Sequence, residues 1–235
     1  MINPFEDDLF ILDLANNHQG SLDHGLNIIH AFGEIARSNG IKAVFKFQFR
    51  DLDTLIHPEF INSKENKHIN RFTSTRLSID DYSKLLDAVK EEGLLSMCTP
   101  FDEKSVDNIL DLNFDFIKVA SCCAQDWPLL DKIAEAYMPT VVSSGGLAIN
   151  DIDNLVSFFS HKGTTMALMH CVSVYPSEDN VLGLNQIDLF KSRYPSIPIG
   201  WSTHEHPENT TAIAIAVAKG ASLFERHVGI NTDKI

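Results

Sequence analysis

Short runs of β-branched, aromatic and aliphatic residues alternate with longer amphipathic segments along the whole chain. Such alternation is typical of parallel strands joined by crossover helices. We expect eight strands, at Phe10–Ala15, Ala43–Phe49, Leu94–Thr99, Phe114–Ala120, Thr140–Ser144, Thr165–Cys171, Ile197–Trp201 and Ser222–Val228. The pattern predicts the α/β class and a (β/α)8 TIM barrel, whose active site lies at the carboxyl ends of the strands.

Segments between these runs refine the prediction. Ser78–Glu92 carries apolar residues at steps of three and four and begins with a good N-cap, which predicts a helix. The polar, histidine-rich stretch Arg50–Arg76 is irregular, so we expect a long loop that forms a lid or pocket wall. Ile235 follows the eighth run too closely for a closing helix, so the barrel lacks its last helix or the chain is the N-terminal part of a longer protein.

Bulk properties narrow the class of protein. A length of 235 residues suits one barrel domain spanning residues 1–235. The formal net charge of −13 argues against a nucleic acid or an anionic membrane as partner, since both require a basic surface, and no run approaches the roughly 18 apolar residues of a membrane span. The four cysteines form no C-x-x-C pair and the chain opens without a signal peptide, which favours a cytoplasmic protein.

Lysines occur within two of the expected strands. Lys46 and Gln48 alternate with phenylalanines on one strand, and Lys118 lies between apolar neighbours on another. Burying an ammonium group without a counter-charge is costly, so two such lysines suggest a buried anionic ligand. The alternative is that each lysine pairs with an acid such as Asp13 or Glu225.

Histidines mark the ends of two neighbouring strands, His204 after the seventh run and His227 in the eighth. Two imidazoles from adjacent strands could bind one divalent metal and leave open positions for water or substrate. A packing role is the commoner fate of any single histidine. His18 and His206 are further candidates.

Hydroxyl groups follow most of the other strands, at Thr99, Ser121, Ser143 and Ser173, and the pair Gly145-Gly146 comes soon after Ser143. Hydroxyls and exposed backbone N–H groups can bind phosphate or carboxylate oxygens. Neither a G-x-G-x-x-G motif nor a P-loop is present, so neither a dinucleotide nor a nucleoside triphosphate is indicated.

Eight strand-end segments, taken in order, carry a family resemblance: Asp13–Ser21, Lys46–Gln48, Thr99–Asp102, Lys118–Ser121, Ser143–Gly146, His170–Pro176, Gly200–His204 and Glu225–His227. Together they resemble the sialic acid (N-acetylneuraminate) synthase family, with a match over nearly all strands in register. Members of that family condense phosphoenolpyruvate with an N-acetylated hexose such as N-acetylmannosamine. They release phosphate and form a nonulosonic acid.

The resemblance implies roles for individual residues. His204 and His227 would bind manganese, or magnesium or cobalt in its place. Phosphoenolpyruvate would be bound by Lys46, Thr99, Lys118, Ser121, Ser143, Ser173 and Ser202, and the sugar by Asp13, Gln48 and Tyr175. We expect Lys46, Lys118 and Glu225 to be the catalytic groups. The metal would polarise the aldehyde, C3 of phosphoenolpyruvate would attack it, and water would add to C2 before phosphate leaves.

The sequence also departs from the family pattern. Asparagine is common at the position of Ser173, and Asp13 stands where a longer glutamate is usual. Cys123 stands five residues after Lys118, where the family has an acid that contacts the sugar. The chain also stops before the family's substrate loop and its antifreeze-like C-terminal domain, which donates a sugar contact to the partner subunit of a homodimer. The sugar half of the site is therefore the less defined half.

Two function classes stay open. The first is a transferase that joins phosphoenolpyruvate to an amino or deoxy aldose, giving a 2-keto-3-deoxy acid and phosphate. The second is a catalytically impaired barrel that binds phosphoenolpyruvate or a sugar acid as a sensing or scaffolding module. A metal-dependent hydrolase barrel would require an H-x-H pair on the first strand, and Asp13–His18 contains none.

Overall fold

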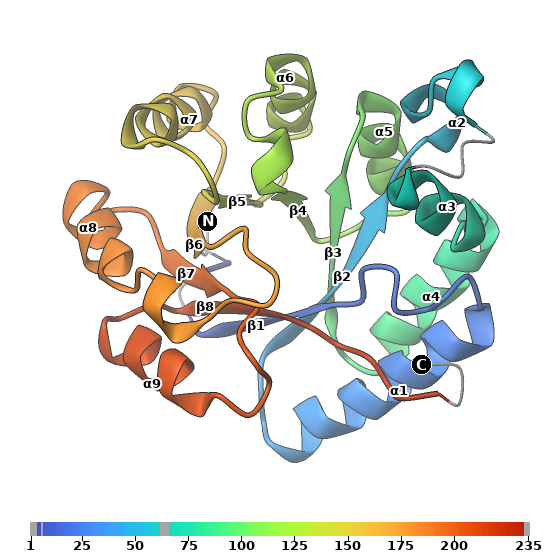
Figure 1. The fold of residues 1–235 in the computed structure, drawn as a ribbon, viewed down its shortest axis with the longest axis horizontal. Coiled ribbons are helices and arrows are strands. Elements are labelled where there is room, and N and C mark those ends of the chain that lie inside the picture. The colour runs from blue at the N-terminus through green and yellow to red at the C-terminus, as the bar shows by residue number, and fades with distance from the viewer. Residues whose placement is uncertain (1–3, 6, 62–65, 233–235) are drawn as a thin grey trace. The chain divides into compact units, whose positions relative to one another are not determined.

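Eight parallel strands form a closed barrel in the order β1 to β8 (Figure 1). The structure is a computed structural model, and it describes residues 4–5, 7–61 and 66–232. The strands are β1 (Leu9–Asp13), β2 (Ala43–Phe49), β3 (Leu95–Pro100), β4 (Phe116–Val119), β5 (Thr140–Ser143), β6 (Met166–Cys171), β7 (Ile199–Ser202) and β8 (Leu223–His227). The predicted (β/α)8 barrel is confirmed, and every predicted strand agrees with an observed one to within two residues at each end.

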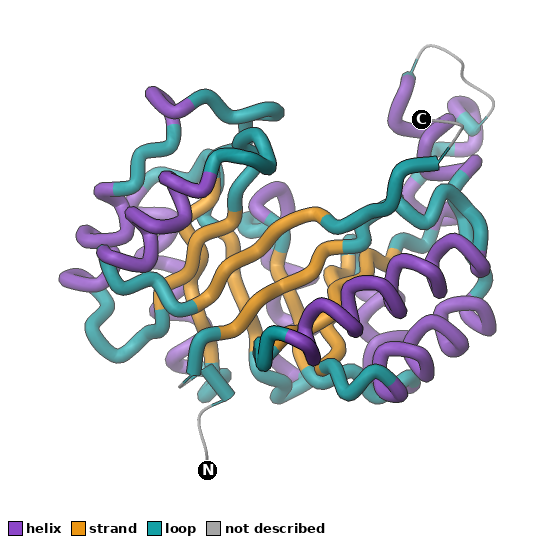
Figure 2. Tube along the Cα trace, turned by 90° about the horizontal axis from the view of Figure 1, so that it is seen from below, coloured by secondary structure: helices purple, strands orange, loops and turns teal. Residues whose placement is uncertain are grey.

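Helices connect the strands, and the alternation can be followed in Figure 2. The α-helices are α1 (Leu22–Ser38), α2 (Leu52–Leu55), α3 (Lys67–Ser74), α4 (Ile79–Glu91), α5 (Glu103–Asp111), α6 (Trp127–Glu135), α7 (Ile149–His161), α8 (Asn185–Arg193) and α9 (Thr210–Ala218). Three 3-10 helices, η1 (Pro58–Phe60), η2 (Ser121–Cys123) and η3 (Asp179–Val181), lie in loops. Within the described residues, every helix is too short or too polar to traverse a bilayer.

The connection between β2 and α4 differs from the irregular loop that was predicted for Arg50–Arg76. It contains α2, η1 and α3. The side chain of Asn66 caps α3 by accepting a hydrogen bond from the N–H of His68. This stretch contains few apolar residues, so its sequence shows no helical periodicity of hydrophobic positions. After β8, residues 228–232 are not helical.

The described residues group into two compact units. Unit 1 comprises Met1–Ile11 and Asp115–Arg226, and unit 2 comprises Leu12–Phe114 and His227–Ile235. Unit 1 therefore carries β4 to β7 and all of β8 except its last residue. Unit 2 carries β2 and β3 with the helices α1 to α5.

In unit 1 the strand register aligns polar side chains at the carboxyl ends of neighbouring strands. Cys171 of β6 pairs with Ser202 of β7, and Ser202 pairs with Glu225 of β8. Below them the strands are apolar, and Leu168 and Trp201 are completely buried. The register thus places Ser202 and Glu225 side by side above buried apolar side chains.

In unit 2 the two faces of β2 have different roles. Phe47 and Phe49 pack against Tyr82 of α4, with ring centroids 6.1 and 4.7 Å apart, respectively. Lys46 and Gln48 occupy the alternate positions, as predicted, and Gln48 pairs in register with Thr99 of β3. α1 and α4 lie side by side over this unit (Figure 1). The predicted N-cap of α4 is confirmed, because the hydroxyl of Ser78 accepts a hydrogen bond from the N–H of Asp81 in a capping box.

His18, one of the further candidate ligands, is a buried residue. Its side chain lies in the connection between β1 and α1 and is only 1% exposed, and its Nδ1 accepts a hydrogen bond from the N–H of Gly20 at 3.1 Å. Burial, with a smaller contribution from the charge of His24, lowers the pKa of His18 from 6.5 to about 4. The folded protein therefore holds this imidazole neutral.

This depressed pKa predicts a loss of stability in acid. The unfolded chain protonates His18 near pH 6.5 and the folded protein only near pH 4, so His18 costs stability as the pH falls between these values. Replacing His18→Asn should shrink the drop in unfolding free energy between about pH 7.5 and about pH 4.5 by about 2 kcal/mol, measured by urea denaturation. The exposed His206→Asn serves as the control. Equal drops in the wild type and His18→Asn would contradict the prediction.

Candidate active site

Lys118 and Glu225 form a buried ion pair in unit 1. Lys118 Nζ lies 2.7 Å from Glu225 Oε2, and the two side chains are 3% and 7% exposed. Nζ also donates a hydrogen bond to Ser143 Oγ at 2.7 Å. For Lys118, the alternative of pairing with an acid is therefore what the structure shows. The pair offsets the cost of removing both charges from water and fixes the ammonium group at the strand ends.

A cradle of hydroxyl and N–H groups follows β5 in the same unit. The N–H of Gly145 donates a hydrogen bond to Ser121 Oγ at 3.0 Å. A Cβ atom on residue 145 would lie 2.6 Å from Ser173 Oγ and 2.8 Å from Ser121 Oγ, which is closer than real Cβ atoms come. Glycine is therefore what allows these two hydroxyls to converge here. Groups of this kind bind phosphate and carboxylate oxygens.

His204 follows β7 and contacts Val172 and Tyr175 in unit 1. Its Nδ1 lies 3.2 Å from the carbonyl oxygen of Val172. Its ring is tilted by 37° against the ring of Tyr175, with centroids 3.7 Å apart, while Tyr175 itself is 67% exposed. A carbonyl only accepts hydrogen bonds, so Nδ1 carries the proton and Nε2 carries the lone pair of the neutral imidazole.

In unit 2 the carboxylate of Asp13 contacts both Lys46 and His227. Asp13 Oδ2 lies 3.2 Å from Lys46 Nζ and 3.1 Å from His227 Nδ1. Asp13 and Lys46 are 3% and 4% exposed, and His227 is half-buried. Burial raises the pKa of Asp13, but Lys46 and His227 together outweigh it and hold that pKa well below its usual range. Lys46, like Lys118, thus has the acidic partner that was considered as an alternative.

Thr99 and Gln48 present polar groups beside this cluster in unit 2. Thr99 is 1% exposed, and its Oγ1 has no hydrogen-bond partner among the residues that the structure describes. A buried hydroxyl without a partner costs free energy. A ligand group that accepts a hydrogen bond from this hydroxyl would remove that cost. Gln48 lines a cavity of about 520 Å³ together with Asn16, Arg50 and Tyr82.

Arg50 was missed in the sequence, although the alternation that puts Lys46 and Gln48 on one face of β2 continues to it. Its guanidinium carbon lies 3.7 Å from the ring centroid of Phe101 and 4.4 Å from that of Phe72. Its Nη2 donates a hydrogen bond to Gln48 Oε1 at 2.8 Å. The aromatic partners come from distant parts of the chain, so only the folded structure reveals them.

Cys123 ends η2 as a buried thiol, 8% exposed, and its N–H donates a hydrogen bond to the carbonyl of Ala120. Its Sγ lies 3.9 Å from Sγ of the exposed Cys122. The position where the family resemblance expects a carboxylate therefore holds no acid.

The two histidines predicted to bind a metal each direct Nδ1 at an acceptor oxygen. His227 Nδ1 donates to the carboxylate of Asp13 and His204 Nδ1 to a backbone carbonyl, so that Nε2 would carry the lone pair in the neutral form of each ring. Within the described ranges, no group of three His, Cys, Asp or Glu side chains forms a ligand cluster. A metal bound through these histidines would leave coordination positions to substrate and water.

Comparison with known families agrees with the family resemblance that the strand-end residues indicated. A sequence model of the NeuB family matches residues 34–234. The chain belongs to the NeuB family. The resemblance to sialic acid synthases that the strand-end segments indicated is thereby confirmed.

Individual relatives of this NeuB-family chain support the assignment. The N-acetylneuraminate-9-phosphate synthase of Homo sapiens is 30% identical over 231 residues, which cover 94% of this chain and 62% of that protein. A solved structure assigned as spore coat polysaccharide biosynthesis protein E of Chromobacterium violaceum is 43% identical, with a TM-score of 0.94 over 97% of this chain and 68% of that one. N-acetylneuraminic acid synthetase of Leptospira borgpetersenii gives 25% identity and a TM-score of 0.81, over 97% of this chain and 75% of that one. The chain spans about three fifths of the human relative's length.

The buried pair of this NeuB-family chain gives a stability prediction. Lys118→Met should lower the free energy of unfolding by about 3–5 kcal/mol, because it leaves the carboxylate of Glu225 buried without the ammonium. The double variant with Glu225→Gln should recover part of this loss, as measured by chemical denaturation. Lys162→Met, which removes a surface pair with Asp131, is the control and should change stability little. Additive losses in the double variant would contradict the prediction.

Proposed function

We propose that this chain is the barrel of an enzyme that condenses phosphoenolpyruvate with an amino or deoxy aldose, giving a nonulosonic-type 2-keto-3-deoxy acid and phosphate. The observation that carries the proposal is the Lys118, Glu225 and Ser143 cluster, with the Gly145 cradle after the same strand β5, in a member of the NeuB family. Phosphoenolpyruvate bears a carboxylate and a phosphate. The cluster offers an ammonium group and hydroxyls to bind them.

The proposed reaction forms one C–C bond and breaks one C–O bond. C3 of phosphoenolpyruvate bonds to the aldose carbonyl carbon, and the former carbonyl oxygen takes up a proton. Water adds to C2, phosphate leaves with the bridging oxygen, and C2 becomes the ketone. Lys118 would stabilise the negative charge of the phosphoenolpyruvate groups, and we assign Glu225 as the acceptor of the proton that the attacking water gives up.

Substrate contacts are assigned within each unit. In unit 1, Ser121, Ser143, Ser173 and Ser202 are assigned to phosphoenolpyruvate and Tyr175 to the sugar. In unit 2, Lys46 and Thr99 are assigned to phosphoenolpyruvate and Asp13 and Gln48 to the sugar. The buried hydroxyl of Thr99 supports this, because a phosphate or carboxylate oxygen would accept its hydrogen bond.

We assign His204 and His227 as ligands of a divalent metal, manganese in first place and magnesium or cobalt as alternatives. The contacts that each ring makes through Nδ1 support the assignment, because in the neutral form they leave the lone pair on Nε2. When bound, a divalent ion supplies Lewis-acid polarisation of the aldose carbonyl. Asp13 would orient His227 toward it through the hydrogen bond to Nδ1.

The cellular setting belongs to the same proposal. A cytoplasmic location is supported by four cysteines that form no disulfide in the described part of the chain. The proposal of a homodimer rests on the family resemblance alone.

A second candidate function rests on Cys123. If the missing carboxylate at this position is essential, the barrel binds phosphoenolpyruvate or a sugar acid without turnover and acts as a sensing or scaffolding module. Tight phosphoenolpyruvate binding by the full-length natural protein, without phosphate release, would support the module. Turnover would exclude it.

The central test measures phosphate release. The protein is incubated with phosphoenolpyruvate, Mn²⁺ and a panel of aldoses that includes N-acetylmannosamine, and phosphate should appear only when the enzyme and a suitable aldose are both present. The full-length natural protein is assayed in parallel. Absence of phosphate release with every aldose, in both proteins, would reject the condensation reaction.

Lys118→Ala should abolish phosphoenolpyruvate binding, measured by titration calorimetry, because it removes the ammonium group at the centre of the unit 1 cluster. Circular dichroism confirms that the variant is folded, and Lys162→Ala at the surface is the matched control. Unchanged affinity in a folded Lys118→Ala variant would count against the assignment.

His204→Asn and His227→Asn should each weaken Mn²⁺ binding, followed by the electron paramagnetic resonance signal of free Mn²⁺. Asp13→Asn should weaken it by about 10- to 100-fold, because the carboxylate that orients His227 is lost. His206→Asn provides an exposed histidine as the control. Equal Mn²⁺ affinity in all four variants would remove the metal assignment.

A further inference from the structure

Gln48 presents a fixed polarity to the cavity that it lines. Arg50 Nη2 lies 2.8 Å from the side-chain oxygen of Gln48. A guanidinium group has donors and no acceptor, so the carbonyl oxygen of the Gln48 amide must be the atom that faces it. Within the described part of the chain, the amide nitrogen Nε2 of Gln48 has no hydrogen-bond partner. A ligand in the cavity would therefore meet a donor.

Two aromatic rings hold the guanidinium group of Arg50 in place. Phe101 follows β3 and Phe72 lies on α3, and their ring centroids are 3.7 and 4.4 Å from the guanidinium carbon, respectively. Stacking of a cation between aromatic faces is favourable and restricts the rotation of the long arginine side chain. The hydrogen bond to Gln48 consequently starts from a group that is already oriented.

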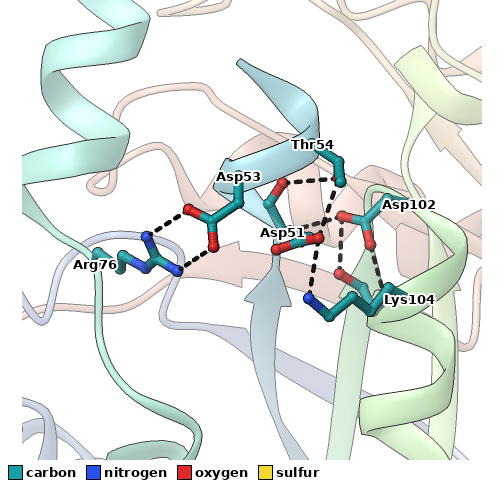
Figure 3. Close-up of polar contacts among 7 residues, drawn as sticks. Asp51, Asp53, Thr54, Arg76, Asp102 and Lys104 are labelled. Carbon is teal, nitrogen blue, oxygen red and sulfur yellow. Dashed lines mark hydrogen bonds and ion pairs between the residues drawn. The ribbon is translucent and has the colours of Figure 1, made fainter. Parts of the chain in front are cut away.

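The backbone directly after Arg50 is also fixed, as Figure 3 shows. The N–H of Asp51 donates to Asp102 Oδ2 at 2.8 Å, and Lys104 Nζ lies 3.1 Å from Asp51 Oδ2. Further along, Arg76 forms two hydrogen bonds with the carboxylate of Asp53, at 3.1 and 3.2 Å. These contacts tie both ends of the β2–α4 connection to each other and to the start of α5.

We infer that Arg50 is a positioning residue that selects the aldose, by holding Gln48 so that Nε2 donates to an acceptor oxygen on the sugar; the inference rests on the proposed function, which assigns Gln48 to the sugar. The substituent that fits best is an acylamino group. Its carbonyl accepts the hydrogen bond, and apolar side chains of the same cavity, Ile79 and Tyr82 among them, can pack against its alkyl part. A free amino sugar carries an ammonium group with donors only, so it opposes Nε2.

Kinetics with matched sugars test the inference. Arg50→Leu keeps an apolar chain between the rings but releases the Gln48 amide. It should raise KM for N-acetylmannosamine about tenfold, the size expected for one lost hydrogen bond. The preference for N-acetylmannosamine over mannosamine should fall, and KM for phosphoenolpyruvate should stay unchanged. Arg50→Lys, which keeps a donor, should restore part of the affinity.

Arg71→Leu is the matched control. Its guanidinium carbon lies 5.4 Å from the ring centroid of Phe72, and Arg71 is exposed and makes no contact with Gln48 among the described contacts. This variant should keep the wild-type KM and sugar preference. If Arg50→Leu also keeps both, the inference is overturned.

A second measurement does not depend on turnover. The NMR signals of the Gln48 side-chain amide, assigned by their loss in Gln48→Leu, should shift in Arg50→Leu and stay in place in Arg71→Leu. If the wild type turns over no aldose, the proposed function fails, and this measurement still decides whether Arg50 positions Gln48. Unshifted amide signals in Arg50→Leu would overturn the inference by themselves.

Discussion

A buried ammonium group requires a counter-charge, and this constraint organises the carboxyl ends of the strands in both units. Lys118 is neutralised by Glu225 in unit 1, and Lys46 by Asp13 in unit 2. Each cation therefore comes with its own carboxylate, in a chain whose formal net charge is −13. An anionic substrate cannot depend on general attraction to such a protein, so binding has to come from oriented donors at short range.

Much of this arrangement could be predicted from the sequence, because strand alternation is a local property. The period of two along Lys46 and Gln48, and the apolar neighbours of Lys118, placed these polar groups on strands. Asp13 and Glu225 were already the named alternatives as their partners. The N-cap at Ser78 could also be predicted from the sequence, since capping depends on residues three positions apart.

Other features could not be predicted, because they depend on contacts between distant segments. Phe72 and Phe101 stand 22 and 51 positions after Arg50 in the sequence, and nothing local links them to it. The convergence of Ser121 and Ser173 on Gly145 likewise requires three different loops to be in place. α3 escaped prediction for a different reason, since few of its residues are apolar and it has no buried face.

The location of Phe72 on α3 has a consequence for how such a protein can change over evolutionary time. α3 belongs to a connection that contributes no strand to the barrel. None of the residues of α3 is buried. Substitutions there are tolerated by the fold far more readily than substitutions in β2. Under the role inferred for Arg50, new sugar preferences can arise through mutations of this surface helix, while the residues assigned to phosphoenolpyruvate remain untouched.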